Sequence, residues 1–173
     1  MLSTKILLTL ATVAAVSAAA IGGTYASFTA TPTTISSNAF TTGTLAMSRS
    51  GSGAIFSSTN MKIGGTATGS VTINNTGSLA ADYTLDSSVT GDSGVAGQLQ
   101  LTIYADTDGS GTPVYTGLIG GLSSTSLGTF AATSGTHTYY FHITLQSTGT
   151  DAGDNALQGK TASASFTWNA TQA

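Results

Sequence analysis

Residues 139–145, Tyr-Tyr-Phe-His-Ile-Thr-Leu, carry the clearest structural signal in this chain. Large apolar side chains alternate with polar or amphipathic ones along the stretch. Tyr139, Phe141, Ile143 and Leu145 fall on one face, and Tyr140, His142 and Thr144 on the other. Successive side chains of a strand point to opposite sides, so the pattern predicts a β-strand that buries one face and exposes the other to water.

The same alternation recurs in short runs separated by Gly, Asn, Asp and Ser. The further predicted strand segments are Phe40–Met47, Ser70–Asn74, Ala81 to Leu85, Leu99 to Ile103, Pro113–Tyr115 and Ala162 to Trp168. The side chains predicted to point inward from them include Val71, Ile73, Tyr83, Leu101, Ala164 and Phe166. No window has a sustained helical period. These runs predict an all-β fold, an antiparallel β-sandwich, with Phe141, Phe166 and Trp168 as principal core residues.

Charged residues are scarce, and this excludes some functions. The chain has 173 residues, four Lys or Arg, seven Asp and no Glu. Without the first 26 residues, Arg49, Lys62 and Lys160 oppose the seven Asp, for a net charge of −4. A nucleic-acid partner is therefore not expected, because binding phosphate requires clustered basic side chains. Without cysteine, the domain has no disulfide and depends on its apolar core.

Residues 1–26 have the three parts of a secretory signal peptide. Lys5 forms a small positive region, an apolar run extends from Ile6 to Ala20, and the exit Thr24-Tyr25-Ala26 consists mainly of small residues. We predict cleavage between Ala26 and Ser27. The alternative is a permanent membrane anchor, because the run from Ile6 to Ile21 is nearly long enough to cross a bilayer.

Residues 27–39 are predicted to be an extended N-terminal arm, ahead of a β-sandwich domain at residues 40–173. The arm is uncharged, rich in Thr and Ser, and has no Asn-Gly or Asp-Gly turn that would fold it back. It is a candidate donor strand for a neighbouring subunit, with Ser27, Phe28, Ala30 and Ile35 as its contact residues. Pro32 has no N–H to donate and would interrupt a ladder. The alternative is a mobile terminus.

Few residues suggest chemistry. His137 and His142 are five apart, an odd spacing that places them on opposite faces of a strand, so they are poor ligands for one metal ion. The stretch from Asp106 to Gly111 begins like a calcium loop, but Gly117 occupies the position of the bidentate Glu. A hairpin turn is favoured there, with a weak calcium site at Asp106 and Asp108 as the alternative. The same interpretation applies to residues 151–155.

Other patterns in the sequence are less specific. Asn74 and Asn169 begin glycosylation sequons, which are common by chance. Thr-x-Thr pairs suggest an ordered Thr surface such as that of ice-binding proteins, but their spacing is irregular and Thr is an ordinary strand residue. No serine lies in a nucleophile elbow. No cofactor and no catalytic residue is predicted.

The order of several segments resembles the TasA and camelysin family. They are GGTYASFTATPTTISSNAFTTGTLAMS at 22–48, NNTGSLAADYTL at 74–85, VYTGLIGGL at 114–122, NALQGK at 155–160 and SFTWNATQ at 165–172. The resemblance implies a jelly-roll-like, exported β-sandwich that polymerises into extracellular fibres of a biofilm matrix or cell surface, each arm completing the sheet of the next subunit. Some members of that family are regarded as metallopeptidases, but this sequence supplies no matching zinc motif. It also lacks the charged insertions of longer members.

Two functions from different classes follow from these observations. The first is a secreted structural subunit whose partner is another copy of itself, with accessory matrix or anchoring proteins as further partners. The alternative is a monomeric secreted module that binds a glycan or a cell-wall partner. A metallopeptidase is a third, less favoured interpretation. Electron microscopy of secreted material separates the first two, and a chelator-sensitive protease assay tests the third.

Overall fold

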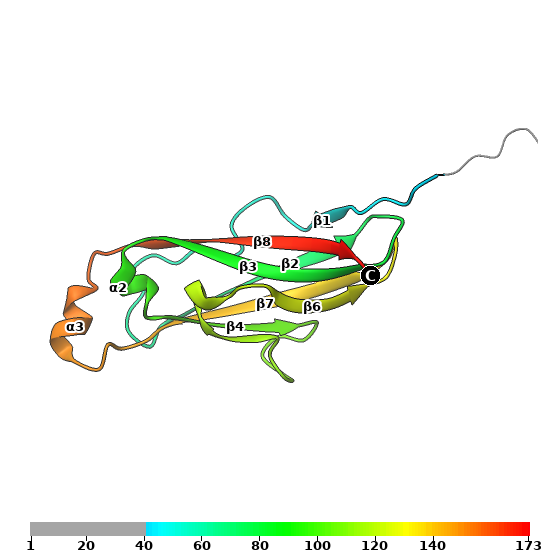
Figure 1. The fold of residues 1–173 in the computed structure, drawn as a ribbon. Coiled ribbons are helices and arrows are strands. Elements are labelled where there is room, and N and C mark those ends of the chain that lie inside the picture. Colours follow the sequence, from blue (N-terminus) through cyan, green and yellow to red (C-terminus); the bar gives the residue numbers. More distant parts are fainter. Residues whose placement is uncertain (1–40) are drawn as a thin grey trace, which may run out of the picture. The chain divides into compact units, whose positions relative to one another are not determined.

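A computed structural model describes residues 41–173, which form two packed antiparallel sheets (Figure 1). The strands are β1 (Met47–Arg49), β2 (Thr66–Asn75), β3 (Ala81–Gly91), β4 (Leu99–Ala105), β5 (Tyr115–Leu118), β6 (Thr125–Phe130), β7 (Thr136–Leu145) and β8 (Ala162–Gln172). The larger sheet has the order β1-β2-β7-β4-β5 and the smaller β6-β3-β8. This confirms the predicted all-β, two-sheet architecture.

The core lies between the two sheets and is built from the predicted alternation. Strand β7 is central in the larger sheet, where Tyr139 pairs with Val71 of β2 and Phe141 with Ile103 of β4. The buried apolar residues are Val71, Ile73, Ala81, Tyr83, Leu85, Leu101, Ile103, Ile119, Leu122, Phe130, Tyr139, Phe141, Ile143 and Leu145. The inward residues predicted for β2, β3 and β7 are all among them, so the predicted inward face of each of these strands is confirmed.

The first strand begins later than predicted. Of the predicted Phe40–Met47 segment, only Met47 lies in β1, and Phe40 is outside the described residues. Residues 41–46 instead lie along the turn between β2 and β3, where the Thr44 amide donates to Ser78 Oγ at 2.9 Å and the Leu79 amide donates to the Thr44 carbonyl at 3.3 Å. The reason is local: the turn offers hydrogen-bonding partners to a Thr- and Gly-rich segment with little apolar alternation.

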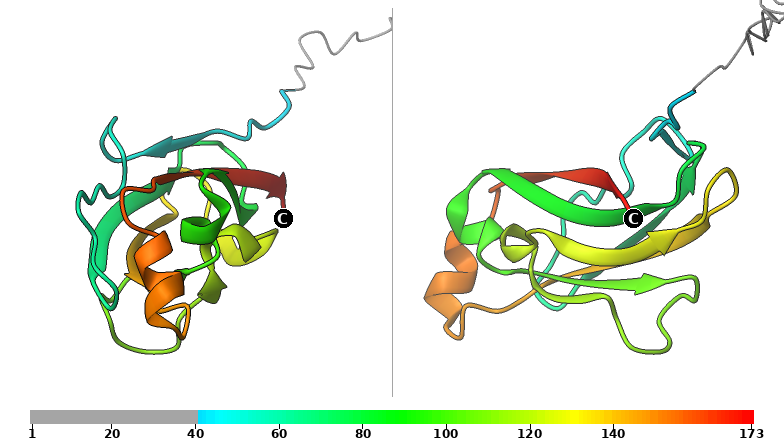
Figure 2. Two further views of the ribbon diagram at one scale, coloured as in Figure 1. Left: turned by 90° about the vertical axis from the view of Figure 1, so that its left-hand side faces the viewer. Right: turned by 45° about the vertical axis from the view of Figure 1, so that its right-hand side comes forward.

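Two short helices, α2 (Ser93–Ala96) and α3 (Asp151–Ala156), lie at one end of the sandwich, and a 3-10 turn, η1, spans Ile119–Gly121 (Figures 1 and 2). The hairpin turn expected at residues 151–155 is wrong, because this stretch forms α3. Thr150 caps the helix, and its Oγ1 accepts a hydrogen bond from the Gly153 amide at 3.1 Å. Such a cap satisfies a free amide at a helix start.

Asn75 fastens the opposite end of the sandwich, at the turn from β2 to β3. Its side chain is 1% exposed. The amide nitrogen donates to the carbonyls of Leu79 at 2.8 Å, Ala131 at 3.1 Å and Phe130 at 3.3 Å, and the side-chain oxygen accepts from the Gly77 amide at 3.0 Å. One side chain thus joins two turns that are distant in sequence.

Candidate functional site

The main candidate site is the free edge of β8. Within residues 41–173, β8 pairs with β3 along its whole length and has no strand on its other side. It spans 11 residues and, as ASASFTWNATQ, contains neither a charge nor a proline. Charged residues, prolines and short strands are the usual devices that keep sheet edges from pairing with other chains. The edge of β8 has none of these protections.

The inward face of β8 is also only partly covered. On the neighbouring strand β3, Tyr83 and Leu85 are buried, whereas Phe166 and Trp168 of β8 are half-buried. The predicted parity of these two aromatic residues is right, but full core burial is not, because β8 is the last strand of its sheet. The inward face of β8 therefore has apolar surface left for an additional strand.

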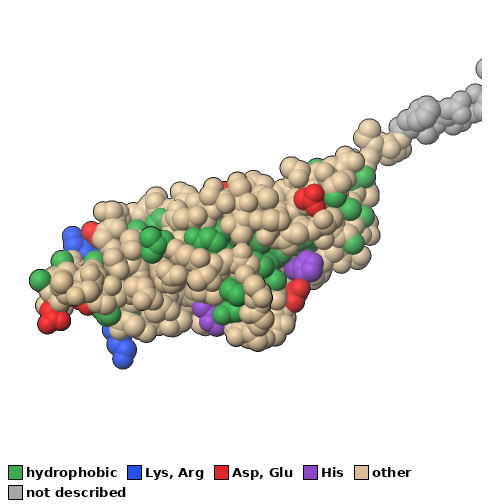
Figure 3. All heavy atoms as spheres, turned by 60° about the horizontal axis from the view of Figure 1, so that its bottom comes forward, with side chains coloured by type: hydrophobic (Ala, Val, Ile, Leu, Met, Phe, Trp, Pro, Cys, Tyr) green, Lys and Arg blue, Asp and Glu red, His purple; other side chains and the backbone are tan. Residues whose placement is uncertain are grey.

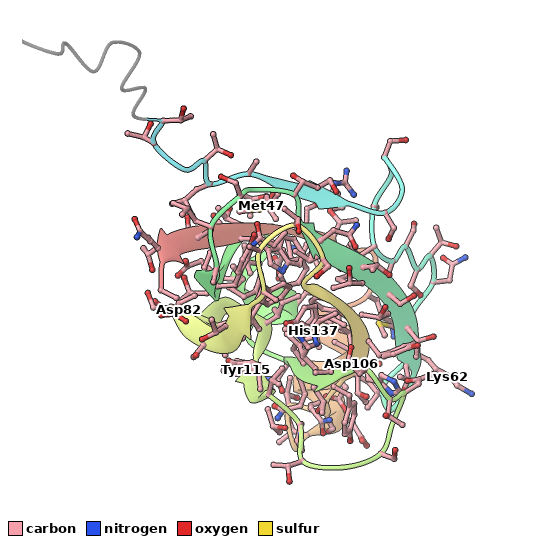
Figure 4. The ribbon with its side chains drawn as sticks, turned by 90° about the vertical axis from the view of Figure 1, so that its right-hand side faces the viewer. Met47, Lys62, Asp82, Asp106, Tyr115 and His137 are labelled. Atoms are coloured by element: carbon pink, nitrogen blue, oxygen red, sulfur yellow. The ribbon has the colours of Figure 1, made fainter. Side chains whose placement is uncertain are left out.

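The edge of β2 borders the same open side. On the side of β2 that faces away from β7, β1 pairs with β2 only at Ile73–Asn75, and the rest of that edge, toward Thr66, has no strand beside it among the described residues. Figure 4 looks along the strands and shows β8 and β2 at one side of the two layers, with the segment that carries Met47 passing over them. The space between these two strand edges is called the gap.

The segment between β1 and β2 reaches into this gap through Ile55 and Phe56. The Phe56 ring lies 5.9 Å from that of Phe166, edge to face at 73°, and 6.4 Å from that of Phe141. The carbonyl of Ile55 sits against Gly69 of β2, where an added Cβ would lie 1.9 Å from the carbonyl oxygen. Gly69 therefore permits this close approach of two backbones.

A cavity of about 780 Å³ continues the gap toward the helical end. Its apolar wall is formed by Phe56, Ala67, Val95, Leu99, Ile119, Ile143, Leu145, Leu157, Ala162 and Ala164, and its polar rim includes residues 57–60 and 158–161. Side chains from both sheets and from the start of β8 thus surround space that described residues leave unfilled.

Two polar atoms near this interior lack partners. Tyr83 Oη and Trp168 Nε1 are buried and form no hydrogen bond with any described residue. Burial raises the pKa of Tyr83 above its ordinary value. A buried donor without an acceptor costs about 1–3 kcal/mol.

The predicted cleavage site, Ala26 and Ser27, and the predicted arm residues Phe28, Ala30 and Ile35 lie outside the described residues. Sequence reasoning missed the free edge of β8, the gap beside it and the position of Phe56 in that gap. The only sequence signal for it was the uncharged composition of Ala162–Gln172, which any strand with a wet outer face could share.

Both histidines are engaged with aspartates. His137 Nδ1 lies 2.7 Å from Asp106 Oδ2, and His142 Nε2 lies 2.5 Å from Asp108 Oδ1. The first pair is seen in Figure 4. Asp106 and Asp108 are in the turn between β4 and β5, as the hairpin interpretation predicted, and His137 packs edge-on against Phe130. The pairs fasten this turn to β7 and do not converge on one point.

No group of three His, Cys, Asp or Glu side chains within residues 41–173 is placed to hold a metal ion. Zinc in proteins is usually held by three or four such ligands. The donor set of the described part therefore does not fit a zinc site. Charged side chains are also sparse over the face drawn in Figure 3, where they form a few separate patches.

No helix among the described residues is both long and apolar enough to cross a membrane. A family model described as "Camelysin metallo-endopeptidase" matches residues 1–106, which is more than half of the chain. No curated protein matches the chain. The family match confirms the resemblance inferred from the sequence, and it includes the predicted arm together with β1 to β4.

Proposed function

The chain belongs to the camelysin family, and we propose that it is a secreted structural subunit that polymerises into extracellular fibres, in a biofilm matrix or on the cell surface. The observation that carries the proposal is the open edge of β8 above a partly filled gap. In this proposal each subunit accepts, alongside β8, the N-terminal arm of another copy. Main-chain hydrogen bonds would supply affinity, as in other cases of strand addition.

The dimensions of arm and acceptor agree. Strand β8 has 11 residues, and the predicted arm, residues 27–39, is of similar length. At about 3.3 Å per residue, an extended arm would cover nearly all of β8. The arm also has no charge to desolvate, which favours its burial between two subunits. Pro32 would occupy a position where its missing N–H is not needed.

Side chains support the same arrangement. Phe28 and Ala30 fall on one face of an extended arm. Full burial of a side chain as large as Phe or Ile stabilises the assembly by about 1.5–3 kcal/mol. The gap between the sheets offers half-buried Phe166 and Trp168 as their contacts. The burial of these rings in the polymer is a consequence of the proposal.

The direct test removes Ser27 to Ile35 from the mature protein and examines the product by electron microscopy. We expect a folded, soluble domain that forms no filaments, and a synthetic peptide of residues 27–38 that caps the growing ends of wild-type filaments. Leu118→Ala is a matched control, because Leu118 is 46% exposed on β5, the far edge of the larger sheet, and should leave assembly unchanged. Filaments of normal length from the truncated protein would mean that sandwiches pack laterally instead.

This role is structural, with another copy of the chain as the principal partner. Accessory matrix or anchoring proteins remain further candidate partners. The family description names a metallo-endopeptidase, so a protease assay with and without a chelator belongs beside the microscopy. We expect no chelator-sensitive cleavage of a general peptide substrate by purified fibres.

A further inference from the structure

Phe56 occupies the gap in an unusual way. It comes from the segment between β1 and β2, and its ring packs against Phe166 of β8 and Phe141 of β7, one from each sheet. Those two rings also contact each other, with centroids 5.0 Å apart at 62°. The position that the Phe56 ring occupies against these two rings is called the aromatic pocket.

The backbone that carries Phe56 is weakly attached. None of residues 54–61 forms a backbone–backbone hydrogen bond with another described residue. The nearest attachments are the Ser50 amide to the Thr72 carbonyl at 2.9 Å and the Gly64 amide to the Leu145 carbonyl at 2.8 Å. Ile55 and Phe56 are half-buried. The segment is thus held mainly by side-chain contacts, and displacing it would break no strand ladder.

An added strand beside β8 would point alternate side chains toward this pocket. An aromatic side chain is the natural occupant, because the pocket already holds one in edge-to-face geometry. Phe28 is the one aromatic residue in the predicted arm. Exchanging one phenylalanine for another costs little apolar contact, while the arm gains the main-chain hydrogen bonds that residues 54–61 lack.

We propose that Phe56 is a placeholder in the aromatic pocket, where it packs against Phe141 and Phe166, and that Phe28 of an incoming subunit displaces it during assembly. The inference rests on the proposed function, because it requires an arm that pairs with β8. It adds a specific binding pocket and a competition for that pocket. In the free subunit Phe56 covers the apolar gap, and it weakens binding of the incoming arm until it is displaced.

The test measures the critical concentration, which is the concentration of unassembled subunit that remains in equilibrium with filaments. The full mature chain is used, as wild type, Phe56→Ala, Phe28→Ala and the double variant, with Leu118→Ala as the control. Phe56→Ala should lower the critical concentration about tenfold or more, because the arm no longer competes with the half-buried Phe56 ring. Phe28→Ala alone should raise it.

In the Phe28→Ala background, Phe56→Ala should change the critical concentration by less than about twofold, because an arm without the ring does not enter the pocket. Thermal unfolding of each variant checks that it is folded. If Phe56→Ala is unfolded, Phe56→Leu replaces it, with an effect in the same direction. Fluorescence of Trp168, the only tryptophan, reports whether the interior of the gap changes on assembly.

The outcomes separate the two proposals. If Phe28→Ala raises the critical concentration but Phe56→Ala has no effect, raises it, or acts equally in both backgrounds, the placeholder exchange is wrong and arm donation stands. If neither Phe28→Ala nor removal of the arm affects assembly, arm donation itself is wrong, and the placeholder inference fails with it.

Discussion

His137 in β7 and Asp106 at the end of the neighbouring strand β4 form a side-chain hydrogen bond, with Nδ1 and Oδ2 2.7 Å apart. The Thr138 amide donates to the other oxygen of Asp106 at 3.0 Å. Partial burial acts to raise the pKa of Asp106, but the hydrogen bonds from His137 and Thr138 and the charge of His137 outweigh it, so the pKa lies below its ordinary value. The contribution of Asp106 to the free energy of unfolding therefore depends on pH.

Acid should destabilise the fold in part through Asp106. A carboxyl whose pKa is lowered by folding stabilises the native state above the unfolded-state pKa of about 3.9, and this contribution is lost as the pH falls through the lower native value. We expect the free energy of unfolding from urea titrations to decline below about pH 4, and to decline less in Asp106→Asn. Asp151→Asn, at an exposed position, is the control. An equal acid slope in wild type and Asp106→Asn would contradict this account.

Asn75→Ala should destabilise the protein by about 2–4 kcal/mol, because it removes a buried amide that donates to the Leu79 and Ala131 carbonyls and accepts from the Gly77 amide. Chemical unfolding measures the change. Asn74→Ala is the matched control at the adjacent, half-exposed position, where a loss below about 1 kcal/mol is expected. Equal effects of the two substitutions would show that Asn75 does not fasten the turns.

Phe141→Ala and Trp168→Ala should differ in cost. Phe141 is 0% exposed at the centre of the core, so its truncation should cost about 3–5 kcal/mol. Trp168 is half-buried on the edge strand, so its truncation in the unassembled subunit should cost less, although its ring is larger. Unfolding of both variants under non-assembling conditions gives the comparison, and a larger loss for Trp168→Ala would place that ring fully in the core.

The mature protein should begin at Ser27. Intact-mass measurement of the secreted chain tests this, because cleavage after Ala26 removes the whole apolar run. Retention of residues 1–26 would make that run an anchor, and would be incompatible with free assembly of soluble subunits.

Much of the fold was readable from the sequence because one-sided burial imposes a period of two. Val71, Tyr83, Leu101 and Phe141 all point inward as their parity predicts. Local alternation does not reveal which strand is last in a sheet, since an edge strand and a central strand can share the same pattern. The half-burial of Trp168 therefore could not be predicted, although its direction could.

The candidate site was largely hidden for a related reason. Phe56 lies in a Ser-rich stretch without alternation, and its contacts with Phe141 and Phe166 join residues far apart in sequence. The late start of β1 was missed because hydrogen bonds to the turn at Ser78 outweighed local strand propensity. The short helix α3 was missed for a similar reason, because the residues at its start, from the Thr150 cap onward, are of types that also favour turns.

The uncharged edge of β8 has a consequence for how a cell could handle this protein. Main-chain hydrogen bonds between strands are largely independent of sequence, so an edge without Lys or Pro can pair with many extended chains. A concentrated store of finished subunits would then be hazardous wherever nascent or damaged polypeptides are present. Supply would have to be rationed to demand, with each molecule released close to the place and moment of its use.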